Sequence, residues 1–268
     1  MITSTDIRHR SKQLYFWLNE YARGYYTGDS HIDANIDLKL FHSLRVADLA
    51  REIARLLNLN PYEEELAYCC GLVHDAGRFK QYALYRSFVD TSEVYHGDLG
   101  VEVLRELNVL RSFSKEETQI IITAVRNHGL LQIDPGIDDI TLMYCNITRD
   151  ADKTDIYQIV ADYYQQPGER NPELELGLSS VPQISALVLD NFRKGKVIKK
   201  TDMQTIDDFK ILQLSWIFDI NFRCTLTSII EKQYLTSIIN SIDNKSLQNE
   251  ISGIIQQYLK KSNFHESI

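Results

Sequence analysis

Apolar residues recur at spacings of three and four along most of this sequence, which is the period of a helix that buries one face. Between Asp37 and Leu57 the set consists of Leu40, Leu44, Ala47, Ile53, Ala54 and Leu57. We find no alternation of apolar and polar residues between hairpin turns, which would predict strands. The pattern therefore predicts an all-α protein.

Capping residues indicate where several of these helices begin and end. Asn60-Pro61-x-Glu63 combines an N-cap, a first-turn proline and a capping-box acid, which predicts a helix that runs to about His74. Ser114 and Glu117 repeat the signature for a helix that ends near residues 127–129. A break is expected at 24–31, and further helices at 6–21, 37–57, 138–164, 183–193, 205–219, 223–242 and 246–260.

The length of 268 residues is compatible with one large domain. We expect a single all-helical domain over residues 1–268, with a core at about 37–156 and a helical extension at about 157–268. The stretch 167–182 is rich in proline and glycine, so it is either a domain boundary or a long loop, and we favour the loop. The apolar segment 216–222 either packs on the core or forms a homodimer contact.

Charge and composition limit the partners of the chain. Its 29 basic and 37 acidic residues give a net charge of −8, which repels nucleic acid and anionic membranes, so we expect neither as a partner. No apolar run reaches the length of a membrane span, and the N-terminus lacks a signal-peptide core. The cysteines contain no C-x-x-C motif, and we expect small buried thiols in a cytoplasmic protein: Cys69, Cys70, Cys145 and Cys224.

Four of the seven histidines form an ordered series with two aspartates: His42, His74-Asp75, His96, His128 and Asp152. A carboxylate such as Asp152, inside an apolar helical segment, is costly to bury unless it is paired or binds a metal. Each residue alone has an ordinary explanation, such as a histidine–carboxylate hydrogen bond in a core, or pairing of Asp152 with Arg149 or Lys153. The complete series makes a metal site the better interpretation.

The residues around this series resemble the HD superfamily of metal-dependent phosphohydrolases over about residues 37–156. The similar segments are FHSLR at His42, GLVHDAGRF at His74, HGDLG at His96 and RDADK at Asp152. The resemblance implies an all-helical bundle with two metal ions. It implies that one ion is bound by His42, His74, Asp75 and Asp152. The other ion would be bound by His96 and His128, and Asp75 would bridge the pair.

Imidazole and carboxylate ligands without thiolate suit two divalent ions of iron, manganese, cobalt or nickel better than zinc. With two aspartates the centre would carry a charge of about +1 to +2, which attracts a phosphate despite the acidity of the chain. A hydroxide that bridges the metals would be the nucleophile. We therefore expect hydrolysis of a phosphomonoester or phosphodiester, in a nucleotide or a related small metabolite.

Basic residues near the ligands are candidates for binding the substrate phosphate: Arg45, Arg78, Lys80, Arg149 and Lys153. Arg78 and Lys153 are the better candidates because they are closest to ligand positions, and with Asp75 they form the expected catalytic set. For Lys80 a solvated surface cation is an equally good explanation. Aromatic residues within 79–95 could stack on a nucleobase, although we favour ordinary packing for most of them.

Two other functions stay open at this stage. A di-iron oxygenase of the myo-inositol oxygenase-like kind uses a similar ligand order and would consume dioxygen. A non-catalytic nucleotide-sensing module would bind without turnover, although an intact ligand set argues against it.

Overall fold

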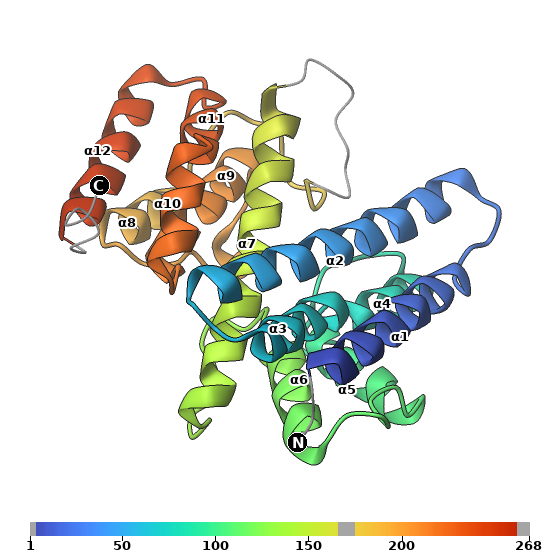
Figure 1. Cartoon of the computed structure of the whole chain (residues 1–268). Helices are drawn as coiled ribbons and strands as arrows, with labels where there is room; N and C mark the ends of the chain where they lie inside the picture. The colour runs from blue at the N-terminus through green and yellow to red at the C-terminus, as the bar shows by residue number, and fades with distance from the viewer. Residues whose placement is uncertain (1–3, 166–174, 262–268) are drawn as a thin grey trace. The chain divides into compact units, whose positions relative to one another are not determined.

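The structure, a computed structural model, describes residues 4–165 and 175–261 (Figure 1). The described residues contain helices and no strand, with one isolated bridge between Ser179 and Thr205. The predicted all-α class is confirmed. The turn expected to close the helix at 166–168, and the first part of the expected loop 167–182, lie outside the described residues.

The chain divides into two compact units, residues 1–155 and residues 156–268, here called the N-terminal and C-terminal units. The division falls within the helix α7 (Asp139–Gln165), which contributes residues to both. The expectation of a single domain stays a prediction.

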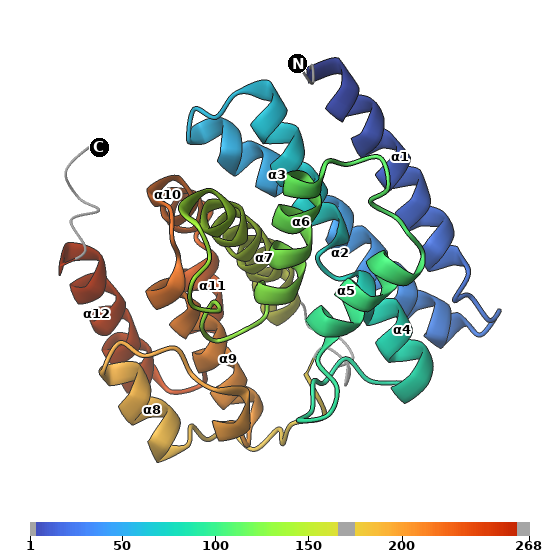
Figure 2. The ribbon, with the colours of Figure 1, turned by 90° about the horizontal axis from the view of Figure 1, so that it is seen from below.

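The N-terminal unit is built from α1–α6 and the first part of α7. The first six helices are α1 (Ser4–Arg23), α2 (Ser30–Leu56), α3 (Pro61–Val73), α4 (Ala76–Tyr85), α5 (His96–Glu106) and α6 (Lys115–Asn127). Helix α3 packs against α1, α2 and α6, and α5 packs between α4 and α6 (Figure 2). Fully buried apolar side chains form the core of the unit, among them Leu18, Ile36, Leu72, Phe79 and Ile121.

Both predicted capping boxes are present, at Asn60 and at Ser114, so α3 and α6 begin where the sequence indicates. The predicted start of a helix at Asp37 is wrong, because α2 begins seven residues earlier. The side chain of Asp29 accepts hydrogen bonds from the backbone N–H groups of His31 and Ile32, which caps α2 at Ser30. Helices α4 and α5 were not predicted.

Helices α4 and α5 approach each other closely at Gly77. A Cβ atom built on Gly77 would lie 2.5 Å from the backbone nitrogen of Gly100 and closer still to the carbonyl oxygen of His96. Only a hydrogen atom fits at this crossing. The crossing fixes the backbone of His96, the first residue of α5, against the residues that follow Asp75.

The C-terminal unit has its own apolar core, which includes Tyr157, Phe192, Ile211, Ile217 and Ile238. Its remaining helices are α8 (Ala186–Arg193), α9 (Ile206–Ser215), α10 (Arg223–Glu231), α11 (Tyr234–Asn240) and α12 (Lys245–Lys261), with 3₁₀ turns at Lys200–Asp202 and Trp216–Asp219. Residues of the apolar segment 216–222 pack in this core.

Two helices predicted in the C-terminal unit are interrupted. The helix predicted at 223–242 is divided into α10 and α11, because Gln233 adopts the left-handed conformation with φ 57°. In the helix predicted at 205–219, the α-helix α9 ends at Ser215, and a 3₁₀ turn follows at Trp216–Asp219.

In the described part of the chain, no helix combines the length and the hydropathy needed to cross a membrane. Cys69, Cys70 and Cys145 are buried as free thiols, whereas Cys224 is half-buried, so the expectation of burial is wrong for Cys224.

Candidate metal centre

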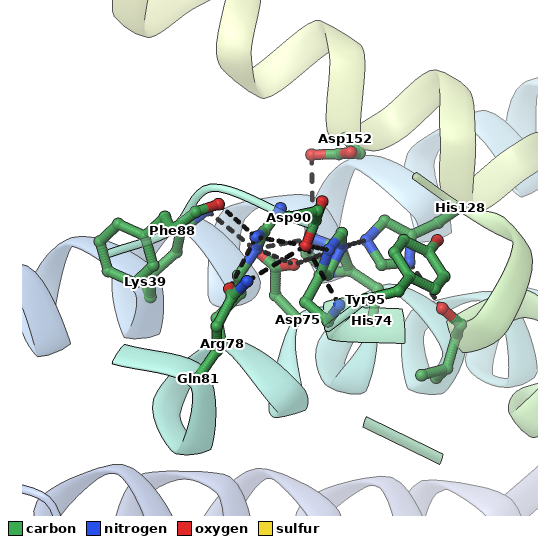
Figure 3. Close-up of polar contacts among 12 residues, drawn as sticks. Lys39, His74, Asp75, Arg78, Gln81, Phe88, Asp90, Tyr95, His128 and Asp152 are labelled. Carbon is green, nitrogen blue, oxygen red and sulfur yellow. Dashed lines mark hydrogen bonds and ion pairs between the residues drawn. The ribbon is translucent and has the colours of Figure 1, made fainter. Parts of the chain in front are cut away.

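All six residues of the histidine–aspartate series meet in one cluster within the N-terminal unit (Figure 3). His42 lies on α2, and His74 and Asp75 form the junction between α3 and α4. His96 begins α5, His128 follows directly after α6, and Asp152 lies on α7. Five elements thus position the side chains, which explains how residues 110 positions apart come together.

The histidines form two pairs, and Asp75 lies between them. The Nε2 atoms of His42 and His74 are 3.2 Å apart, and those of His96 and His128 are 2.9 Å apart. Oδ2 of Asp75 is 3.7 Å from both Nε2 atoms of the first pair. Oδ1 of Asp75 is 3.5 Å from Nε2 of His96 and 3.4 Å from Nε2 of His128. Each oxygen of this one carboxylate therefore faces a different histidine pair.

Asp152 completes the first pair, with Oδ1 3.1 Å from Nε2 of His42 and 3.8 Å from Nε2 of His74. Two sets of three residues have ligand atoms that all lie within 4.8 Å of one another: His42, His74 and Asp152, and His74, Asp75 and His128. The Asp152 side chain is 16% exposed, whereas the other five ligand side chains are at most 4% exposed. The cluster is therefore buried, and it is most open beside Asp152.

Hydrogen bonds at the outer ring nitrogens determine which nitrogen of each imidazole faces the cluster. Nδ1 of His74 donates to the carbonyl oxygen of Gly71, and Nδ1 of His128 donates to that of Val125, each at 2.7 Å. Carboxylates accept from the other two rings: Asp155 from His42 at 2.7 Å, and Asp90 from His96 at 2.8 Å. When one of these rings is neutral, its proton is therefore on Nδ1 and its Nε2 lone pair points inward.

When all four rings are neutral, these lone pairs and the oxygens of Asp75 and Asp152 form a set of electron-pair donors without protons between them. Two neutral imidazoles with nitrogen lone pairs 2.9 Å apart repel each other unless a cation lies between or beside them. Metal-binding histidines commonly donate a hydrogen bond from the other ring nitrogen to a carboxylate or a carbonyl oxygen, as each of these four rings does. The residues present therefore fit the binding of divalent metal ions.

Burial and neighbouring charges keep most of these groups in the forms that bind metals. Burial lowers the pKa of His74 to about 4, and burial together with Arg78 lowers the pKa of His96 well below its usual value. Burial opposes ionisation of Asp75, but the Lys39 ammonium and His74 hold its pKa well below the usual range. Both histidines are thus neutral at pH 7, and Asp75 is charged.

His42 behaves differently from His74 and His96. Burial disfavours its charged form, but hydrogen bonds with Asp152 and Asp155 raise its pKa to about 9. The same contact lowers the pKa of Asp152, although burial acts against it. Metal binding at His42 therefore has to displace a proton.

Residues 40–164, which include all six residues of the cluster, match the family model described as HD domain. This match assigns residues 40–164 to the HD superfamily. Comparisons with curated proteins and with solved structures give no match. The HD superfamily is one of metal-dependent phosphohydrolases, and the His/Asp cluster of this HD domain fits metal binding.

One of the expected phosphate-binding residues, Arg78, lies directly at the cluster in the HD domain. Nε of Arg78 lies 3.4 Å from Oδ1 of Asp75, and Figure 3 shows Arg78 and His128 on opposite sides of that carboxylate. This Nε is buried and has no hydrogen-bond partner in the described structure, whereas Nη1 donates to Gln81, Phe88 and Asp90. Lys153 is buried on α7, next to Asp152 in the chain.

The other three basic residues have different surroundings. Arg45 donates from Nε and Nη2 to Asp155 at 2.6 and 3.0 Å, so it acts on the cluster through the carboxylate behind His42. Arg149 donates to three backbone carbonyls, including that of His128. The structure does not bring Lys80 into the cluster, because its ammonium pairs with Glu102 and Glu106. Its interpretation as a surface cation agrees with this position.

Three residues of the site were missed by the sequence analysis: Lys39, Asp90 and Asp155. The ammonium of Lys39 lies 2.9 Å from Oδ2 of Asp75. Lys39 precedes His42 by three positions and Asp155 follows Asp152 by three, so helical spacing could have found both. Asp90 lies in the segment between α4 and α5, where no periodic pattern indicates its position. It accepts hydrogen bonds from the ring and the backbone N–H of His96.

Proposed function

We propose that this protein is a metal-dependent phosphohydrolase that cleaves a phosphomonoester or phosphodiester in a nucleotide or a related small metabolite. One observation carries the proposal: four imidazole Nε2 atoms and two aspartates face one another, and both oxygens of Asp75 lie between the two histidine pairs. Membership of the HD superfamily supplies the reaction class.

One divalent ion would be held by His42, His74, Asp75 and Asp152. The other would be held by His96, His128 and Asp75. Imidazole and carboxylate donors without thiolate favour iron, manganese, cobalt or nickel over zinc. When bound, such ions lower the pKa of coordinated water and neutralise negative charge on a phosphate. The outer carboxylates Asp90 and Asp155 would hold the rings of His96 and His42 in the tautomer that presents Nε2.

The charge balance around the cluster favours an anionic substrate. The site contains five cations and four carboxylates, so its side chains carry a net charge of +1. The cations are Lys39, Arg45, Arg78, Arg149 and Lys153, and the carboxylates are Asp75, Asp90, Asp152 and Asp155. Two divalent ions would raise this local excess to about +5. In a chain with a net charge of −8, an anion is therefore attracted to this place in particular.

Among the basic residues, Lys39, Arg78 and Lys153 are our candidates for contact with the phosphate. Lys39 is 18% exposed and already neutralises Asp75, and Arg78 keeps Nε directed at the same carboxylate. A phosphate that approaches beside Asp152, the most exposed ligand, would meet Lys153 on the same helix. We propose roles in catalysis for Asp75, Arg78 and Lys153. Arg45 would contribute through Asp155.

The test is elemental analysis of the purified chain, combined with assays of phosphatase, phosphodiesterase and nucleotide substrates under several metals. His74→Ala and Asp75→Ala should lose bound metal and turnover together, whereas Arg78→Ala and Lys153→Ala should retain metal and lose activity. His9→Ala is the matched control, because His9 is exposed on α1 and its ring forms a hydrogen bond only with Gln13 within the described structure. It should retain metal and turnover.

Each other result has a defined meaning. Full activity in Asp75→Ala would contradict the proposed role of this carboxylate. Iron-dependent consumption of dioxygen, without phosphate release, would replace the proposal with an oxygenase. Tight nucleotide binding without turnover under any metal would make the protein a sensing module.

A further inference from the structure

A second candidate site lies at the other ends of the helices α5 and α6. A pocket of about 400 Å³ is formed by the C-terminal end of α5, the turn at residues 107–113 and the N-terminal end of α6. Arg105, Arg111 and Lys115 line it, and none of its lining residues in the described structure is acidic. It shares no residue with the metal centre. We call it the basic pocket.

Arg105, Arg111 and Lys115, the three cations of the basic pocket, are exposed to solvent. Across the described residues, none of their side chains makes an ion pair or a hydrogen bond. Arg126, on the same helix as Lys115, shows the ordinary situation, because it pairs with Asp98 and Asp134. In a chain with more acidic than basic residues, these three cations form a local positive surface that can attract an anion.

The floor of the basic pocket is apolar. Leu104 and Phe113 are 2% and 9% exposed, and both line the pocket beneath the charged side chains. A second hollow, of about 590 Å³, adjoins it and shares Asn108, Arg111 and Phe113. Trp17 lines this second hollow from α1. A ligand that spans both hollows would meet cations on one side and aromatic side chains on the other.

We propose that the basic pocket binds a polyphosphorylated small molecule with an aromatic ring, such as a nucleoside triphosphate. Its phosphates would contact Arg105, Arg111 and Lys115, since guanidinium and ammonium groups are the side chains that bind phosphate oxygens most strongly. The ring would lie against Phe113 and Trp17. We expect this site to bind its ligand without a metal, because all three charged residues that line it in the described structure are cations.

The probe is adenosine 5′-(β,γ-imido)triphosphate, titrated into the full chain by calorimetry, once loaded with metal and once in EDTA. Binding at the basic pocket should persist in EDTA. The variant R111E/K115E should weaken this EDTA-resistant binding by roughly tenfold or more. The matched control is K196E/K199E, which changes the net charge equally at two exposed lysines of the C-terminal unit. Its affinity should stay within about twofold of the wild type.

Tryptophan fluorescence tests where the ring lies, because Trp17 and Trp216 are the two tryptophans of the chain. Quenching by the probe should disappear in Trp17→Phe and persist in Trp216→Phe. Inorganic tripolyphosphate, which lacks a ring, should bind more weakly than the probe.

Unchanged binding in R111E/K115E would overturn the proposal, and so would an equal loss in the control. Quenching that persists in Trp17→Phe would overturn the placement of the ring. Equal affinities for tripolyphosphate and the probe would overturn the requirement for an aromatic ring in the ligand. Variants that melt like the wild type exclude unfolding as the cause of lost binding. Absence of metal-dependent turnover, with EDTA-resistant binding retained, would contradict the proposed phosphohydrolase activity alone.

Discussion

Replacement of Gly77 by alanine should move α5 and displace His96 from the metal centre. The added Cβ atom would lie 2.5 Å from the backbone nitrogen of Gly100, whereas an ordinary contact needs about 3.4 Å. The helices would therefore have to separate by roughly 1 Å. No side-chain rotation relieves this contact, because the nearest atoms belong to the backbone of α5. Overpacking of this kind costs about 1–3 kcal/mol.

The displacement also affects metal binding. Nδ1 of His96 lies 2.8 Å from Asp90 and its Nε2 lies 2.9 Å from that of His128, so a shift of about 1 Å away from these partners breaks the hydrogen bond to Asp90 and separates the two inward nitrogens. We expect Gly77→Ala to lower the melting temperature by about 2–12 °C. We also expect it to weaken metal affinity by about 10–100-fold, as a lost outer-shell contact does.

Melting curves and metal content after dialysis provide the assay. Gly253→Ala is the control, since Gly253 lies within α12 and a Cβ atom there would have no neighbour within 4 Å. It should stabilise the chain by about 0.5–1 kcal/mol, because alanine favours the helix. If Gly77→Ala melted like the wild type and retained its metal, the close crossing of α4 and α5 would not be a constraint on His96.

Glu117 is buried and accepts hydrogen bonds from Arg10 and Tyr62. Burial favours the neutral form of Glu117, yet these hydrogen bonds hold its pKa below the usual value. The charged carboxylate therefore stabilises the fold at neutral pH. This stabilisation is lost as the pH falls through the pKa of the unfolded chain and then through that of the folded chain. In urea titrations at pH 7, the free energy of unfolding of Glu117→Gln should be roughly 3 kcal/mol below that of the wild type. This difference should shrink in acid. A difference that does not change with pH would refute the prediction. Removal of metal with EDTA should lower the melting temperature of the wild type and leave that of His74→Ala unchanged, because a bound ion stabilises the folded chain by about 2.7 kcal/mol at one hundred times its dissociation constant. An equal effect of EDTA on both chains would argue against binding at His74.

Much of the fold could be predicted because it depends on local signals. The capping boxes at Asn60 and Ser114 determine the starts of α3 and α6 through hydrogen bonds within four residues. The N-cap residue of α4, Asp75, makes no capping hydrogen bond with its side chain, and the division at Gln233 depends on a left-handed residue that is not glycine. Such features depend on tertiary contacts, which the spacing of apolar residues does not show.

The same distinction applies to the site. The six histidines and aspartates could be named because their order along the chain resembles that of a known superfamily. Asp90 could not, because it reaches His96 from a segment without periodic pattern. Nor does the sequence show that Arg149 is engaged with backbone carbonyls or that Lys80 pairs with Glu102. Helical spacing predicts which face a residue occupies, and it does not predict which partner its long side chain reaches.

Each of the four imidazole rings of the cluster is held at its outer nitrogen by an acceptor, two of them carbonyl oxygens and two of them carboxylates. A ring that rotated by half a turn would leave its acceptor without a donor in a dry interior, so the rings lose their rotational freedom when the chain folds. The entropic cost of fixing the rings is therefore part of the free energy of folding. A cation that binds later does not have to order its ligands. A shell prepared in this way should discriminate among ions by size and preferred geometry, because it cannot rearrange to suit them.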